Sequence, residues 1–277
     1  MSLAQAHSCS RMVMSMPAPD IREFVAPGAW RTVDFISDLH LEADHPATVE
    51  AFSHYLDTTS ADAVFLLGDL FEVWVGDDAI QEAGSFEAAC CAVLRRAASR
   101  RALYFMHGNR DFLVGAGFTE ATGIPVLQDP TVLVFAGGRW LLSHGDALCL
   151  ADLPYQKFRA MARDPQWQAQ LLALPLAARR AQGRSARAES ESRKQSGTAF
   201  YGDVDNAAAV QWLQAAQARA LIHGHTHLPA DHVLQGDGDT ALARHVLTDW
   251  DLSARTPRAE ALRLTAAGLE RISLVPR

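Results

Sequence analysis

The sequence predicts an α/β fold that is interrupted by a helical insertion, and three observations support this prediction. Short apolar, β-rich runs alternate with helical patterns through the first half of the chain. Residues 152–194 contain no convincing strand and are rich in Ala, Leu, Gln and Arg. Five short motifs of His, Asp and Asn stand outside this helical stretch, each after an apolar run. Sites in α/β folds assemble at the carboxyl ends of strands, so we expect the motifs to converge there.

The expected strands are short runs of apolar and β-branched residues. In the first half of the chain they lie at residues 32–37, 63–67, 102–106, 131–135 and 139–143. The run at residues 63–67 reads AVFLL and is apolar throughout, which is typical of a central strand buried on both faces. Gly137 and Gly138 separate the last two runs and predict a hairpin turn. A further short strand is expected at residues 220–222, before the fifth motif.

Helical patterns lie between these runs and beyond them. They cover residues 46–56, 86–98 and 203–218. Pro46 suits the first turn of its helix, and Asp203 is expected to be the N-cap of the last one. Residues 152–194 predict further helices, which are broken at Pro165 and Pro175.

The helical stretch divides the chain into a core and an insertion. We expect residues 31–150 and 201–277 to form the core, and residues 151–200 to form a helical cap. Residues 1–30 are expected to be a flexible N-terminal extension, because they are irregular and lack the continuous apolar segment of a signal peptide.

Composition is that of an ordinary soluble globular protein. Of the 277 residues, 49% are hydrophobic and 21% are charged, and the formal net charge is −7. The negative charge argues against general nucleic-acid binding, for which a strongly basic domain is expected. No apolar run approaches the roughly 18 residues of a membrane span. The four cysteines form no C-x-x-C pair, which favours a reducing compartment and therefore a cytoplasmic location.

Five motifs carry residue types that bind metals in proteins. In chain order they are Asp38-Leu39-His40, Gly68-Asp69, Gly108-Asn109-Arg110-Asp111, His144-Gly145-Asp146 and Gly224-His225-Thr226-His227. Each motif alone is a weak signal, since Gly-Asp pairs and Gly-Asn turns are common in structural roles. Their combination, in this order and each after an apolar run, favours a functional site.

The side chains of these motifs form a mixed set of seven candidate ligands. They are the carboxylates of Asp38 and Asp69, the imidazoles of His40, His144, His225 and His227, and the amide of Asn109. Carboxylate and imidazole together suit Mn, Fe, Zn or Ni better than calcium. The Asp-x-His and His-x-His spacings would place both side chains on one side of an extended backbone. Seven ligands suit two ions that share a bridging carboxylate and act on a displacement at phosphorus.

The motif set D-x-H, G-D, G-N-H/R-D/E, H and G-H-x-H resembles the signature of the calcineurin-like metallophosphoesterases. This resemblance implies a four-layer α/β/β/α sandwich with two facing sheets and, as cofactor, two manganese ions. It implies that one ion binds Asp38, His40, Asp69 and His227. It implies that the other ion binds Asp69, Asn109, His144 and His225, so that Asp69 bridges the two.

Arg110 departs from the pattern of many members of this family, which carry a proton-donating His at that position. Arg cannot give up a proton at working pH, so we expect Arg110 to be an electrostatic clamp for phosphate. An enzyme without that acid should prefer a leaving group that needs no protonation. A phosphate that leaves from a pyrophosphate meets this requirement, and Asn109 and Arg110 are the expected catalytic residues.

The chain also resembles a narrower family, the UDP-2,3-diacylglucosamine hydrolases of the bacterial lipid A pathway. Matching stretches run from Asp34 to about Trp250 and include GDLFEVWVGDD at residues 68–78. The resemblance implies that water attacks the α-phosphorus of the substrate pyrophosphate, which gives UMP and 2,3-diacylglucosamine 1-phosphate. It implies substrate contacts at Asn109, Arg110, Asp152, Ser190, Lys194 and His225.

The expected cap has a composition that suits an anionic lipid. Residues 157–194 hold nine basic and three acidic residues. A basic, Leu- and Ala-rich cap can contact a pyrophosphate, acyl chains and anionic headgroups, and each basic residue near a membrane contributes about 1 kcal/mol. We therefore expect peripheral association with the inner face of the cell inner membrane. For residues 179–193, a solvated charged helix pair is the alternative, and the sequence indicates no oligomeric state.

Two other functions stay open at the level of sequence. A pyrophosphatase or phosphodiesterase of the same superfamily that acts on other nucleotide sugars or on dinucleotides would carry the same ligands. A non-catalytic interaction protein on the same fold would be expected to have lost some of them. All seven ligand positions are filled in this chain, which argues against the non-catalytic alternative.

Overall fold

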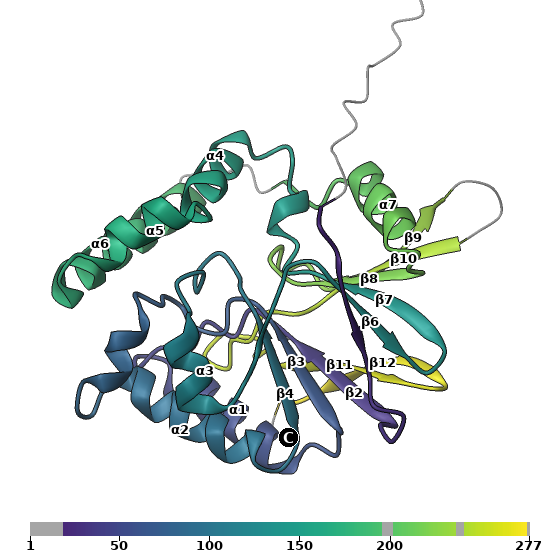
Figure 1. Ribbon diagram of the computed structural model, residues 1–277, viewed down its shortest axis with the longest axis horizontal. Coiled ribbons are helices and arrows are strands. Elements are labelled where there is room, and N and C mark those ends of the chain that lie inside the picture. The colour runs from purple at the N-terminus through teal and green to yellow at the C-terminus, as the bar shows by residue number, and fades with distance from the viewer. Residues whose placement is uncertain (1–18, 196–201, 237–240, 276–277) are drawn as a thin grey trace, which may run out of the picture.

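Two six-stranded β-sheets face each other in the computed structural model of the chain (Figure 1). The structure describes residues 19–195, 202–236 and 241–275, apart from the side chains of residues 189–191 and 193–195. We call the sheet with strand order β12-β11-β2-β3-β4-β5 the first sheet. The second sheet has the order β1-β6-β7-β8-β10-β9.

The first sheet is parallel over four strands and antiparallel at one edge. Its strands are β2 (Thr32–Ile36), β3 (Ala63–Leu67), β4 (Ala102–Met106), β5 (Val126–Leu127), β11 (Glu260–Thr265) and β12 (Gly268–Ser273). β2 to β5 run parallel, and β11 pairs antiparallel with both β2 and β12. All of β3 is buried, because Val64 and Leu66 face one core cluster and Phe65 faces the other. The prediction of a central strand at residues 63–67 is confirmed.

The second sheet contains the predicted hairpin. Its strands are β1 (Arg22–Val25), β6 (Thr131–Phe135), β7 (Gly138–Leu142), β8 (Ala220–His223), β9 (Ala230–Gln235) and β10 (Ala241–Val246). Phe135 pairs with Gly138, so the turn residues are Ala136 and Gly137, one position earlier than predicted. Their φ angles are 50° and 72°, as a type I′ turn requires at both positions.

Residues 22–25 correct the expectation of a flexible extension over residues 1–30. They form β1, which pairs parallel with β6 at the edge of the second sheet. The sequence signal was weak because the strand has only four residues and all but one of them are exposed. Phe24 is half-buried and packs against the cluster between the sheets. The prediction for residues 1–18 lies outside the described residues.

Helices cover the outer faces of both sheets and complete the predicted four layers (Figure 1). α1 (Pro46–Thr58), α2 (Phe86–Ala98) and α3 (Ala116–Thr122) cover the first sheet, and α7 (Asn206–Ala215) covers the second. Short 3₁₀ helices lie at Asp77–Gln81 and Asp146–Leu148. Phe52 and Leu94 share a core cluster with Leu66 of β3. Trp212 shares another with Leu221 of β8.

Three consecutive helices lie together at one side of these layers (Figure 1). They are α4 (Leu153–Ala162), α5 (Pro165–Leu172) and α6 (Leu176–Gln195). Pro165 is the first residue of α5 and Pro175 directly precedes α6, so both predicted breaks are confirmed. Within the described ranges, no helix combines the length and the apolar composition that crossing a membrane requires.

The helix expected at residues 203–218 begins later than predicted. Its N-cap is Asp205, whose side chain accepts a hydrogen bond from the Ala208 amide at 2.9 Å. Asp203, the predicted N-cap, instead forms a two-pronged ion pair with Arg244 of β10, at 2.7 and 2.9 Å. Aspartate is a favourable N-cap residue at either position. Because Arg244 engages Asp203, Asp205 is the residue that caps the helix.

Candidate metal centre

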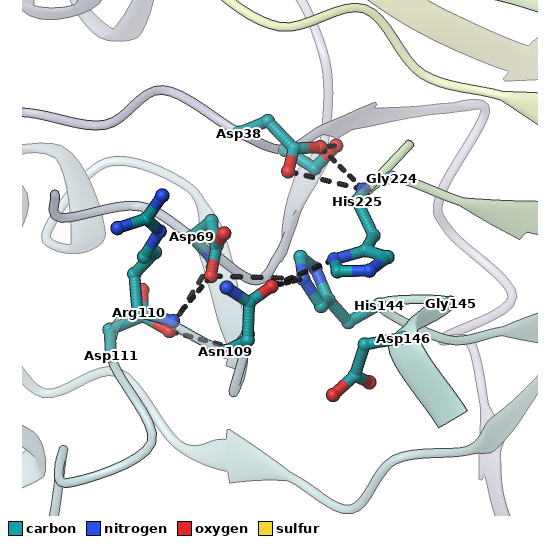
Figure 2. Close-up of polar contacts among 12 residues, drawn as sticks. Asp38, Asp69, Asn109, Arg110, Asp111, His144, Gly145, Asp146, Gly224 and His225 are labelled. Carbon is teal, nitrogen blue, oxygen red and sulfur yellow. Dashed lines mark hydrogen bonds and ion pairs between the residues drawn. The ribbon is translucent and has the colours of Figure 1, made fainter. Parts of the chain in front are cut away.

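All five motifs follow the carboxyl ends of strands. Asp38, Asp69 and Asn109 come after the parallel strands β2, β3 and β4 of the first sheet. His144 and His225 come after β7 and β8, which are parallel neighbours in the second sheet. The two sheets therefore bring these side chains to a common edge, where Figure 2 shows them facing one another.

Asp38, His40 and His227 form one group of ligand atoms, which lie within 4.8 Å of one another. The Nε2 atoms of His40 and His227 are 3.2 Å apart. Nε2 of His227 is also 3.3 Å from Oδ1 of Asp38. Two imidazole nitrogens and a carboxylate oxygen thus converge on one point, which is the arrangement that a metal ion requires.

A second group contains Asp38, Asp69 and His144, again within 4.8 Å. Oδ1 of Asn109 extends this group, because it lies 3.0 Å from Nε2 of His144 and 2.8 Å from Nδ1 of His225. Figure 2 shows dashed lines that run from the Asn109 amide oxygen to both imidazole rings. Nδ1 of His144 lies 2.9 Å from the Leu67 carbonyl, a hydrogen bond that fixes the ring and directs Nε2 to the cluster.

The structure therefore brings all seven predicted ligands into one cluster. Its carboxylate, imidazole and amide groups suit a divalent transition metal. Asp38 belongs to both three-residue groups, whereas the family resemblance implies that Asp69 bridges two ions. Which carboxylate bridges stays a prediction.

Most of the predicted ligands have a left-handed backbone, which non-glycine residues rarely adopt. The φ angle lies between 48° and 67° at Asp38, His40, Asp69, His225 and His227. Such residues cost of order 1–3 kcal/mol each and cluster at functional sites. The extended backbone that the i, i+2 spacing predicts is therefore wrong at both motifs. The paired side chains meet because the chain curls around the cluster after each strand.

Two motif glycines allow the loops to approach each other closely. A Cβ atom at Gly108 would lie 2.1 Å from Oδ1 of Asp69. A Cβ atom at Gly224 would lie 2.2 Å from Oδ2 of Asp38. Both distances are far below van der Waals contact, so the position of each carboxylate depends on the adjacent glycine.

Asp111 holds two of the loops together through their backbones. Its buried carboxylate accepts hydrogen bonds from the amides of Leu70 at 2.7 Å and Gly108 at 2.8 Å. Burial and the negative charge of Asp69 raise the pKa of Asp111 to about 7. Asp111 thus fixes the backbone directly after the ligand Asp69 and directly before the ligand Asn109.

Helix α4 is attached to the site through Asp146 of the fourth motif. The buried Asp146 carboxylate accepts hydrogen bonds from Tyr155 Oη at 2.6 Å and from Arg159 Nε at 2.9 Å. Arg163 donates to the Gly108 carbonyl at 3.0 Å. The ring of Tyr155 lies 5.4 Å from that of His225, centroid to centroid.

These three anchors were missed at the level of sequence, although a signal for them exists. Tyr155, Arg159 and Arg163 are spaced four residues apart, so they share one face of a helix. The two arginines were grouped with the other basic residues of the cap as a surface for anions. Nothing in the local sequence marks Asp146 as their partner.

Glu72 was also missed, and it lies directly behind the ligand His40. Its carboxylate is 2.9 Å from Nδ1 of His40, 3.4 Å from Nη1 of Arg110 and 3.0 Å from Nε of Arg187. Burial opposes ionisation, but the close contact with His40 and the charges of Arg110 and Arg187 lower the pKa of Glu72 to about 2. A carboxylate behind an imidazole ligand is the usual means by which proteins orient that ligand.

The predicted substrate residues lie in different environments. Arg110 lies beside the cluster, and its backbone amide donates to Oδ1 of Asp69 at 2.8 Å. Asp152 is the N-cap of α4 and accepts a hydrogen bond from the Tyr155 amide at 3.0 Å. Ser190 and Lys194 belong to α6, and their side chains lie outside the described part of the structure.

Most basic residues of the cap whose side chains the structure describes are engaged with the core. Those with partners on the core are Arg159, Arg163, Arg179, Arg180 and Arg187. Arg179 is only 3% exposed and binds Asp78 and the Val75 carbonyl. These arginines bind acidic side chains and backbone carbonyls of the core domain. Lys157 and Arg184 are exposed.

Comparisons with known proteins agree with this site. Residues 31–229 match the calcineurin-like phosphoesterase family. A UDP-2,3-diacylglucosamine hydrolase of Chromobacterium violaceum is 49% identical, over 79% of this chain and 90% of that protein. The Bordetella pertussis protein of the same name is 44% identical, over 86% of this chain and 93% of that one.

A third relative and one solved structure extend the comparison. The UDP-2,3-diacylglucosamine hydrolase of Xanthomonas axonopodis pv. citri is 44% identical, over 88% of this chain and all of that protein. Vps29 of Entamoeba histolytica with zinc is 15% identical, at a TM-score of 0.43, and the match covers 88% of this chain and 99% of that one. The family match spans more than half of the chain and contains all five motifs. The chain belongs to the calcineurin-like phosphoesterase family.

Proposed function

We propose that the protein hydrolyses the pyrophosphate of UDP-2,3-diacylglucosamine. Water attacks the α-phosphorus, and the products are UMP and 2,3-diacylglucosamine 1-phosphate. Relatives named for this activity are 43–49% identical over most of the chain, which supports the proposal. The observation that carries it is Arg110, which stands beside the ligand cluster where many family members have a proton donor.

Arg110 favours a pyrophosphate over a simple ester as the bond that breaks. Its guanidinium cannot protonate a leaving alkoxide, but it can stabilise negative charge that develops on phosphate oxygens. The proposed leaving group is itself a phosphate monoester, which departs without taking up a proton. Asn109 and Arg110 are therefore the proposed catalytic residues.

We infer that the cluster holds two divalent ions, with manganese as the metal. The first is assigned to Asp38, His40, Asp69 and His227. The second is assigned to Asp69, Asn109, His144 and His225. When bound, the ions supply Lewis-acid activation of water and neutralise developing charge. The short distances among these ligand atoms support the assignment.

Substrate contacts are proposed from both the core and the cap. Asn109, Arg110 and His225 belong to the ligand cluster or lie beside it. Asp152, Ser190 and Lys194 are the proposed contacts from the cap. The contact between the Tyr155 and His225 rings supports this arrangement, because it places the start of α4 next to the cluster.

The cap, residues 151–200, is proposed to meet the acyl chains and the membrane surface. Large apolar side chains are exposed on α4 and at the end of α5, at Leu153, Phe158, Met161, Leu172 and Leu174. Most cap arginines with described side chains are engaged with the core, so we assign the lipid contact chiefly to these apolar residues. The protein would then act at the cytoplasmic face of the inner membrane as a peripheral protein.

Turnover of two substrates tests the proposal. With manganese, UDP-2,3-diacylglucosamine should give UMP, and UDP-N-acetylglucosamine should react far more slowly. EDTA should stop the reaction, and added manganese should restore it. Equal rates for the two substrates would favour a general nucleotide-sugar pyrophosphatase, and no UMP from either would contradict the proposal.

A further inference from the structure

Glu72 joins two parts of the molecule that are far apart in sequence. It lies three residues after Asp69, and only 8% of its surface is exposed. On one side its carboxylate contacts Nδ1 of the ligand His40 at 2.9 Å. On the other side it contacts Nε of Arg187, a residue of helix α6, at 3.0 Å. A single carboxylate thus links the cap to an imidazole of the metal centre.

Arg187 also contacts Glu42, on the loop that carries the other ligands. Nη2 of Arg187 lies 2.8 Å from Oε1 of Glu42, and Nη1 bonds to the second oxygen of the same carboxylate. Glu42 lies two residues after His40, whereas Glu72 follows Asp69. One arginine of α6 therefore spans the two loops that present Asp38, His40 and Asp69.

Backbone hydrogen bonds join the two loops to each other. The His40 amide donates to the Asp69 carbonyl at 3.0 Å, and the Leu41 amide donates to the Leu70 carbonyl at 2.9 Å. The Glu72 amide donates back to the Leu41 carbonyl at 3.2 Å. A shift of Arg187 would therefore act on the backbone of the two loops that carry the ligands, as well as on the Glu72 side chain.

We propose that Glu72 is a positioning residue that couples the docking of α6 on the core to the metal centre through His40. We call α6 seated when Arg187 contacts Glu42 and Glu72. A carboxylate on Nδ1–H fixes the ring and keeps Nε2 available as a ligand. Arg187 restrains that carboxylate only while α6 is seated. The coupling rests on the proposed metal centre and is independent of the proposed substrate.

The coupling is reciprocal by thermodynamic linkage. If a seated α6 favours the metal-binding orientation of His40, a bound metal must in turn favour the seated helix.

Arg180 provides the internal comparison. It lies on the same helix and pairs with Glu82 and Glu87, and among the described contacts neither carboxylate touches a metal ligand.

Metal affinity of three variants is the first test. Glu72→Gln keeps the shape of the side chain and removes its charge, and it should weaken Mn²⁺ binding by about 10–100-fold, as loss of an outer-shell partner does. Arg187→Gln should also weaken Mn²⁺ binding, although it lies on the cap. Glu82→Gln, the control that breaks a cap-to-core pair elsewhere, should leave Mn²⁺ affinity unchanged. Circular dichroism of each variant checks that the fold is intact.

Hydrogen exchange of the α6 amides is the second test. Mn²⁺ should slow this exchange in the wild type and in Glu82→Gln, but not in Glu72→Gln. Unchanged Mn²⁺ affinity in Arg187→Gln, or equal slowing by Mn²⁺ in Glu72→Gln and the wild type, would overturn the coupling. Neither readout uses the lipid substrate, so the coupling can hold while the proposed activity fails, and the reverse.

Discussion

At the ligand residues, backbone conformation and side-chain chemistry act together. Asp69 has a φ angle of 51°, its carboxylate lies against Gly108, and its backbone is tied to Asp111. His225 has a φ angle of 67°, and its amide donates to the Asp38 carboxylate at 2.9 Å. The loops thus hold the ligands in place before an ion binds, which lowers the entropic cost of ordering those ligands on binding.

Gly108→Ala tests the close approach of these loops. The new Cβ would lie 2.1 Å from Oδ1 of Asp69, so the carboxylate or its loop must move. Overpacking of this kind costs about 1–3 kcal/mol, and if that cost falls on the metal-binding conformation, metal affinity drops by roughly 5- to 150-fold. Metal analysis after equilibrium dialysis measures the effect. Gly28→Ala is the control, because a Cβ at Gly28 meets no atom within 4 Å; equal metal contents would refute the account of Gly108.

Arg110→Ala tests the phosphate clamp. The side chain contacts Glu72, whereas only the backbone amide of Arg110 reaches the ligand Asp69. We therefore expect kcat to fall by about 10²–10³, as when a transition-state donor is removed, while metal content holds. Steady-state kinetics and metal analysis on the same preparation decide the matter. Loss of metal in this variant would mean that Arg110 supports the centre and does not clamp phosphate.

His144 links metal binding to pH. Burial alone would lower its pKa, but the negative charges of Asp69 and Asp38 raise it to about 9 in the metal-free protein. His144 is then protonated at neutral pH, whereas a metal ligand must be neutral. Mn²⁺ uptake should release about one proton at neutral pH, and affinity should rise with pH towards 9. Calorimetry in buffers of different ionisation enthalpy measures this release; uptake without it would show that His144 is already neutral in the metal-free protein.

At the scale of elements, α4 depends on one buried carboxylate. Asp146 accepts hydrogen bonds from both Tyr155 and Arg159, and its burial makes the loss of either partner expensive. Helix α6 is attached differently, through ion pairs with acidic residues around the first sheet. The group of three helices is therefore attached to the core at both ends. α4 contacts loops of both sheets, through Asp146 and Gly108, and α6 contacts residues around the first sheet.

Arg159→Met tests the anchor of α4. It leaves the Asp146 charge without its main cationic partner, which costs 3–5 kcal/mol for a fully buried pair. Arg159 is 24% exposed, so we expect a loss of about 2 kcal/mol in the free energy of unfolding. Urea denaturation measures it. Lys157→Met on the exposed face of the same helix is the control, and an equal effect in both variants would show that Asp146 is not the anchor.

At the scale of the whole molecule, the sequence predicts the architecture better than the details that complete it. The buried run at residues 63–67 identifies β3, since five consecutive apolar residues fit a strand covered on both faces. β1 escapes detection because it is short and mostly exposed, and its order comes from pairing with β6. The N-cap of α7 escapes because Arg244, far along the chain, engages Asp203.

The site shows the same division. The order and strand-end positions of the motifs predict all seven clustered ligands, because ligand chemistry resides in residue type. The left-handed backbones at five of them, and the anchors Glu72 and Asp146, depend on contacts between distant segments. No local pattern specifies those contacts. The core partners of the cap arginines escape prediction for the same reason, since they lie on other parts of the chain.

The fate of the oxygen from water tests the central claim most directly. The purified protein with Mn²⁺ would hydrolyse UDP-2,3-diacylglucosamine in water labelled with heavy oxygen, and mass spectrometry would locate the label. Attack at the α-phosphorus, with Arg110 stabilising a phosphate leaving group, predicts labelled UMP and unlabelled 2,3-diacylglucosamine 1-phosphate. Label in the sugar phosphate, or release of UMP that persists after the metal is removed, would contradict the account.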